Sequence, residues 1–204
     1  RRPCGRFAKL AVIHRGGWWY RAPAMSDVIE TFHRILVPVD FVDAGDDEDE
    51  KGAQSVTVND HKIVFTAPTV RAIALATSLG RFYGSTVRLC HSTPPLQTST
   101  VYSGPVALPS QLIAEIHERA RATSTAALEQ LGPRFGQGIT LEYVVRPGQP
   151  LAVVMEEAER FKPDLIVMAA SGRSRVARFF VGSTADRVIR QAPCPVMVVP
   201  ADGR

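Results

Sequence analysis

The chain is poor in the residues that support disulfide-bonded, zinc-binding or membrane-spanning proteins. It has three cysteines, Cys4, Cys90 and Cys194, and none lies at a short pairing or metal-binding spacing from another. An odd number of scattered cysteines is typical of a reduced protein, so we expect a cytoplasmic location. No apolar run approaches the roughly 20 residues of a membrane span, so no membrane partner is expected.

The common catalytic signatures are also missing from the sequence. It contains no Gly-x-x-x-x-Gly-Lys-Ser/Thr loop, no Gly-x-Gly-x-x-Gly, no His-Glu-x-x-His and no Gly-x-Ser-x-Gly. These motifs bind nucleotide phosphates, dinucleotides or zinc, or supply a serine nucleophile for acyl transfer. We therefore do not expect a dedicated enzyme.

The positive charge of the chain is confined to its first residues. The formal net charge is +4, but residues 1–24 hold six basic and no acidic residues, which leaves −2 for residues 25–204. A basic surface for nucleic acid is therefore not expected. We predict that residues 1–30 are a leader or extension outside the fold, with a native start at Met25, that residues 31–200 form one domain, and that residues 201–204 are a tail.

The rest of the chain alternates between predicted strands and helices. Residues 34–40 are a continuous apolar run, which indicates a strand buried on both faces. Apolar stripes predict helices, among them one from about Pro68 to Gly84 that buries Leu75 and a longer one that buries Leu112. The predicted strands are 34–40, 85–91, 139–145, 164–169 and 195–200, and the helices are about 68–83, 110–131, 151–162 and 183–191. This order favours an α/β fold, an open five-stranded parallel sheet with helices on both faces.

Residues 42–66 interrupt this pattern and are predicted to be a surface insertion. Six of the eight residues 43–50 are acidic, which is typical of a solvated loop. Residues 55–65 predict a hairpin that turns near Asn59 and Asp60.

The segment from Ala169 to Thr184 holds most of the residues that could bind a ligand. It leaves the carboxyl end of a predicted strand, contains Gly172 and Gly182, and enters a helix at Ser183. We predict that Ser183 is the N-cap, which would leave the first helix amides free to bind phosphate. The alternative is that Gly172 merely ends a strand and Ser183 merely caps a helix. His91, at the end of the second strand, is expected to pack rather than to act as an acid or base.

This segment resembles the signature of nucleotide-binding universal stress proteins, which is Gly, two residues, Gly, nine residues, Gly and then Ser or Thr. Gly172, Gly182 and Ser183 fit the spacing, and Ala169 stands where the first Gly is expected. Residues 35–40 and 191–200 also resemble the beginning and end of that family's domain. The resemblance implies a Rossmann-like sandwich of the adenine nucleotide alpha hydrolase type.

The resemblance also implies a ligand, ATP or the related ADP or AMP, at the ends of the first and fourth strands. Magnesium would bind only through the nucleotide. Asp40 and the backbone of Ser92 would contact the nucleoside, and Arg173 would lie at the ribose and phosphates. The complete implied set is Pro38, Asp40, Ser92, Ala169, Gly172, Arg173, Gly182, Ser183 and Thr184.

Three functions follow from these features. The leading one is a regulatory module in stress response that binds an adenine nucleotide and presents a nucleotide-dependent dimer or partner surface. The second is a dimeric interaction module without nucleotide, and the third is an enzyme such as a weak ATPase. The resemblance implies a homodimer through the strand Val196–Val199, which is predicted to be a sheet edge.

Overall fold

Five parallel strands form the central sheet of the protein. The computed structural model describes residues 31–43, 52–93, 110–170 and 182–200. The sheet has the strand order β6-β5-β1-β7-β8, so the order reverses between β1 and β7. Its strands are β1 (Arg34–Pro38), β5 (Thr86–Thr93), β6 (Thr140–Pro147), β7 (Leu165–Ala169) and β8 (Val196–Val199). The predicted five-stranded parallel sheet is confirmed.

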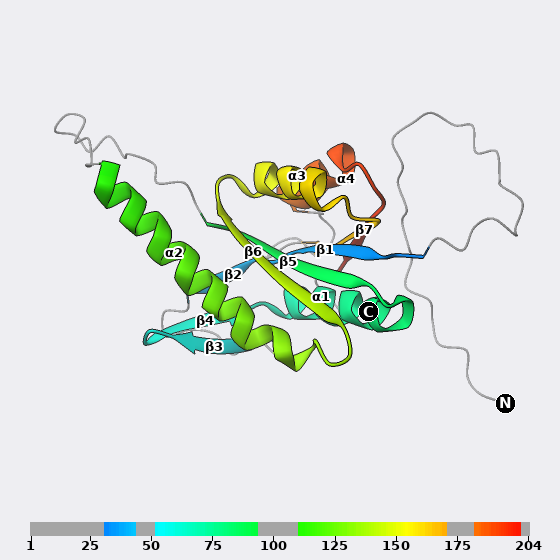
Figure 1. Ribbon diagram of the computed structural model, residues 1–204, viewed down its shortest axis with the longest axis horizontal. Helices are drawn as coiled ribbons and strands as arrows, with labels where there is room; N and C mark the ends of the chain where they lie inside the picture. Colours follow the sequence, from blue (N-terminus) through cyan, green and yellow to red (C-terminus); the bar gives the residue numbers. More distant parts are fainter. Residues whose placement is uncertain (1–30, 44–51, 94–109, 171–181, 201–204) are drawn as a thin grey trace, which may run out of the picture.

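In the described part of the chain, four α-helices cover the two faces of this sheet. They are α1 (Ala67–Tyr83), α2 (Ser110–Leu131), which runs into the short 3-10 turn Gly132–Arg134, α3 (Pro150–Phe161) and α4 (Ser183–Gln191). Figure 1 shows α3 and α4 on one side of the sheet and α1 on the other. Two separate buried clusters agree with this view: one holds Ile73 of α1 with Leu128 of α2, and the other holds Val154 of α3 with Val188 of α4. The central strands are apolar on both sides because each side meets a helix layer.

A small antiparallel sheet follows β1. It contains β2 (Phe41–Asp43), β3 (Gln54–Val58) and β4 (His61–Phe65) in the order β2-β4-β3. The turn between β3 and β4 is formed by Asn59 and Asp60, which both have positive φ (49° and 66°), as tight hairpin turns require. The predicted hairpin is confirmed.

One face of this hairpin belongs to the main core. Val56, Val58, Ile63 and Phe65 are buried in the same cluster as α1 and α2, and Phe65 is fully buried. The sequence predicted the hairpin but not how deeply it packs, because its alternating pattern does not show what covers its apolar face.

One leucine on each of the two longer helices is more exposed than predicted. Leu75 of α1 is 38% exposed and Leu112 of α2 is 40% exposed, whereas both were expected to point inward. Ala76, which belongs to the same predicted stripe as Leu75, is buried in α1, and so is Gly80 one turn further on. A Cβ at Gly80 would lie 2.8 Å from Val87 Cγ2, so α1 approaches the sheet too closely for large side chains there.

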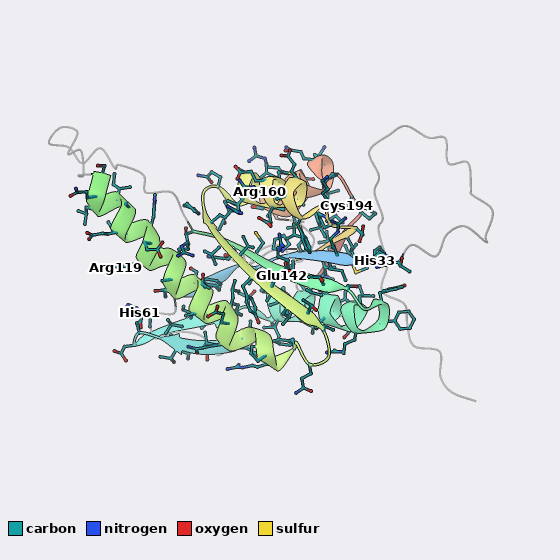
Figure 2. The ribbon with its side chains drawn as sticks, in the orientation of Figure 1. His33, His61, Arg119, Glu142, Arg160 and Cys194 are labelled. Carbon is teal, nitrogen blue, oxygen red and sulfur yellow. The ribbon has the colours of Figure 1, made fainter. Side chains whose placement is uncertain are left out.

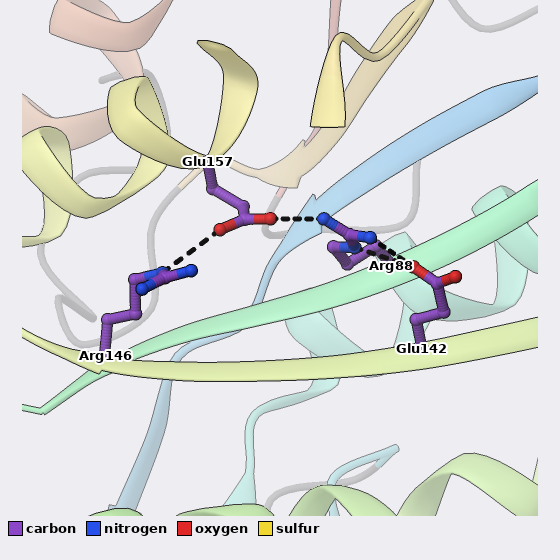
Figure 3. A network of polar contacts seen from close by, with 4 residues as sticks. All are labelled: Arg88, Glu142, Arg146 and Glu157. Atoms are coloured by element: carbon purple, nitrogen blue, oxygen red, sulfur yellow. Dashed lines mark hydrogen bonds and ion pairs between the residues drawn. The ribbon is translucent and has the colours of Figure 1, made fainter. Parts of the chain in front are cut away.

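A four-residue ionic network joins α3 to the edge of the sheet (Figure 3). The buried carboxylate of Glu157 accepts from Arg88 Nη1 at 2.5 Å and from Arg146 Nε at 3.2 Å. Arg88 also donates to Glu142 at 2.8 Å and 2.5 Å, which joins β5 to β6. Burial lowers the pKa of Arg88, but the hydrogen bonds to Glu142 and Glu157 outweigh it and raise the pKa above its usual value. Such a network fixes geometry more than it adds stability, since desolvation offsets much of the attraction.

Candidate functional site

The candidate site lies where the strand order reverses, between the carboxyl ends of β1 and β7. In an open parallel sheet this is the place where ligands bind, because the loops that leave the two strands turn to opposite faces. Asp40 follows β1 by two residues and is half-buried, and Ala169 is the last residue of β7. The structure therefore places two of the predicted residues at the same edge of the sheet.

The first turn of α4 lies beside the end of β7. Gly182 N donates to Ala170 O at 2.6 Å, and Ala170 N donates to Val199 O at 2.8 Å. These bonds tie the beginning of α4 to the ends of β7 and β8. The amides of Ser183, Thr184 and Ala185 belong to the first helical turn, where N–H groups have no acceptor within the helix. They are suited to a phosphate or another anion.

The cap of α4 differs from the prediction. Gly182 is the N-cap, with φ −57° and ψ 153°, and Ser183 is the first helical residue. The prediction that Ser183 caps the helix was therefore wrong by one residue. Gly182 has no side chain to compete with a ligand for the first amides, so this shift leaves them open.

Two further predicted residues lie at the same edge of the sheet. Pro38 ends β1 and pairs with Cys90, and Ser92 lies two residues beyond Cys90 on β5. Ser92 pairs with Arg146 of β6. Gly172 and Arg173, the remaining members of the predicted set, lie outside the described residues.

His91 is a buried packing residue, as expected. Its Nδ1 lies 2.8 Å from the Val39 carbonyl oxygen, and its ring stacks on Phe41 with a centroid distance of 3.8 Å. Phe41 was not among the residues predicted for the site. Its position directly after Asp40 was the only available signal, and a contact between β2 and β5 is not visible in a linear pattern.

The described thiols are not suited to nucleophilic chemistry. Burial raises the pKa of Cys90 to about 12 and that of Cys194 to about 11. Both are therefore neutral thiols near pH 7, and a thiol is a poor nucleophile compared with a thiolate.

Metal binding by side chains alone also finds no support in the described part of the chain. No group of three or more His, Cys, Asp or Glu residues is placed there to hold a metal ion. His33 and His61 lie at opposite ends of the molecule (Figure 2). Of the helices described, none is long and apolar enough to cross a membrane.

Comparisons with known proteins agree with this geometry. The family described as "Universal stress protein family" matches residues 31–200. Universal stress protein MJ0531 of Methanocaldococcus jannaschii is 35% identical over 89 residues, which is 44% of this chain and 51% of that relative, so the match spans about half of the relative's length. A universal stress protein of Thermus aquaticus is 29% identical over 129 residues, which is 63% of this chain and 88% of the relative.

Solved structures show the same fold. The universal stress protein UspA from Lactobacillus plantarum has a TM-score of 0.58 at 20% identity, with 82% of this chain and 97% of that chain covered. The hypothetical protein MJ0577 has a TM-score of 0.60 at 17% identity, with 83% and 96% covered. The family match, the five-stranded parallel sheet and the order of its elements lead to one conclusion: this chain belongs to the universal stress protein family.

Proposed function

We propose that this stress-response protein binds ATP or a related adenine nucleotide at the reversal point between β1 and β7, and that it acts as a regulatory module rather than as an enzyme. The observation that carries this proposal is the first turn of α4, which is hydrogen-bonded to the end of β7 at the ligand-binding edge of the sheet. The helix dipole adds partial positive charge at the same place.

Each part of the nucleotide has a matching group at this edge. The phosphates contact the amides of Ser183 and Thr184 beside Gly182, where no side chain blocks their approach. The Asp40 carboxylate accepts from a ribose hydroxyl or an amine, and the backbone at Ser92 and Pro38 borders the nucleoside. Ala169, Gly172 and Arg173 complete the proposed site at the ribose and phosphates. Magnesium enters only with the nucleotide.

Calorimetry with ATP, ADP and AMP tests this proposal. We expect the wild type to bind at least one of them, and Gly182→Val to lose that binding because a branched side chain lies where phosphate approaches. The backbone at Gly182 is in a region open to every residue, so the loss does not come from backbone strain. Ser183→Ala removes only a hydroxyl and costs about 1 kcal/mol.

The Ala169→Gly variant completes this experiment. It restores the glycine of the family signature, so it should bind as tightly as the wild type or more tightly. If neither the wild type nor Ala169→Gly gives heat with any nucleotide, the nucleotide-binding function is wrong, and the nucleotide-free dimer module takes its place.

We also propose a homodimer through β8, which is an edge of the five-stranded sheet in the described structure. An edge strand presents unpaired backbone groups that a second chain can use. Val198→Lys places a charge on this edge, and we expect it to shift the protein toward the monomer in sedimentation. Thr140→Lys, on an exposed residue at the opposite edge, serves as the control and should leave assembly unchanged. A wild type that sediments as a monomer at micromolar concentration contradicts the dimer.

A further inference from the structure

The chain turns a corner at Asp40. β1 ends at Pro38 in the large sheet, and β2 begins at Phe41 in the small one. Only Val39 and Asp40 lie between the two strands, so the backbone from which the Asp40 carboxylate extends is positioned by how its two neighbours are held. The Val39 N–H donates to Cys90 O at 2.8 Å, which holds the corner against β5.

One side chain contacts both neighbours of Asp40. His91 Nδ1 lies 2.8 Å from the Val39 carbonyl oxygen, and the imidazole stacks on the Phe41 ring at 3.8 Å with an interplanar angle of 18°. A carbonyl oxygen only accepts, so Nδ1 is the nitrogen that carries the hydrogen and donates. His91 is only 7% exposed, so its ring cannot move away without opening the core.

We propose that His91 is a positioning residue that holds the Asp40 carboxylate ready for the nucleoside part of the ligand; this inference rests on the proposed nucleotide function. The Val39 hydrogen bond fixes the backbone before Asp40, and the Phe41 stack fixes the backbone after it. A carboxylate held in place before binding loses less freedom when the nucleotide arrives, and the affinity is higher for that reason. His91 acts through Asp40.

A double-mutant cycle on ATP affinity tests this role. His91→Phe keeps a ring against Phe41 and removes the donor, and Asp40→Asn removes the carboxylate charge. We expect His91→Phe to weaken ATP binding by roughly five- to tenfold, which corresponds to one lost hydrogen bond of ordinary strength. If His91 acts through Asp40, the double variant binds ATP no more weakly than Asp40→Asn alone, because interacting residues do not give additive losses.

Two other variants separate positioning from folding. His91→Gln retains an N–H donor for Val39, so it should lose less ATP affinity than His91→Phe. If His91→Phe does not fold, His91→Gln replaces it in the double-mutant cycle with Asp40→Asn. Leu128→Ala opens the fully buried core on the same side of the sheet, from α2, and should lower the melting temperature while ATP affinity stays within about twofold.

Additive losses in the cycle overturn the inference, and so does a loss for Leu128→Ala as large as that for His91→Phe. In both cases the wild type still binds ATP, so the proposed function survives. A wild type that binds no nucleotide overturns the function and the inference together.

Discussion

Ser183→Glu should weaken ATP binding by about 100-fold or more while the protein melts no lower than the wild type. Two unit charges about 4 Å apart repel by about 4 kcal/mol at an effective dielectric constant of about 20, and salt screening lowers this value at an exposed position. The new carboxylate lies in the first turn of α4, where it opposes the phosphates. The same carboxylate interacts favourably with the dipole of α4, which stabilises the folded protein by about 0.3–1 kcal/mol. The substitution should therefore not lower the melting temperature.

Ser110→Glu is the matched control for this variant. Ser110 is also an exposed serine at the first residue of a helix, α2, and Figure 1 shows that α2 begins far from β7. Calorimetry should show unchanged ATP affinity for Ser110→Glu, and thermal melting should show no loss of stability for either variant. Equal ATP affinity in Ser183→Glu and the wild type would show that the phosphates do not bind at α4.

Phe65→Ala should lower the free energy of unfolding by about 3–5 kcal/mol, which is the usual cost of deleting a buried aromatic ring. Phe65 is fully buried at the end of β4, and its ring lies 5.2 Å from the ring of Phe41. Phe41 in turn stacks on His91, so the cavity opens beside the corner that carries Asp40. The hairpin is thus part of the core that supports the site.

Phe82→Ala provides the control for this prediction. Phe82 is 81% exposed on α1, and its loss should change the free energy of unfolding by no more than about 0.5 kcal/mol. Urea unfolding measures both variants. If Phe65→Ala costs as little as Phe82→Ala, the hairpin contributes nothing to the core and its burial in the structure is contradicted.

Strands β1 and β7 were predictable because each contains an unbroken run of apolar residues. Ile35, Leu36 and Val37 are all fully buried, and an unbroken apolar run is what a strand between two helix layers requires. The end of α1 was equally clear, since Gly84 takes the left-handed conformation (φ 69°) that glycine adopts most easily.

The burial of single residues on the helices was less predictable, because hydrophobicity is not the only property that decides burial. At α1 the distance to the sheet favours small residues, so Thr77 is buried while Leu75 remains partly exposed. In α2 the buried residues, among them Leu128 and Leu131, lie in the second half of the helix, whereas Leu112 in the first half is 40% exposed. An apolar stripe in the sequence does not show how far along the helix the core that covers it extends.

Part of the candidate site followed from the sequence because it depends on glycine spacing and on strand ends. Gly182 and Ser183 do lie at the beginning of α4, and Asp40 does follow β1. The contacts of His91 with Val39 and Phe41 did not follow, because they join residues about 50 positions apart in the chain. Gly172 and Arg173 lie outside the described residues, so their place in the site stays a prediction.

Hydrogen–deuterium exchange with and without saturating ATP is the decisive experiment for nucleotide binding at α4, because it reports both binding and its location. A bound phosphate accepts from the amides in the first turn of α4 and protects them from exchange. We expect slower exchange at Ser183, Thr184 and Ala185, with no comparable change at the beginning of α2. Unchanged exchange at α4, or protection confined to another part of the molecule, would contradict nucleotide binding at the β1–β7 reversal point.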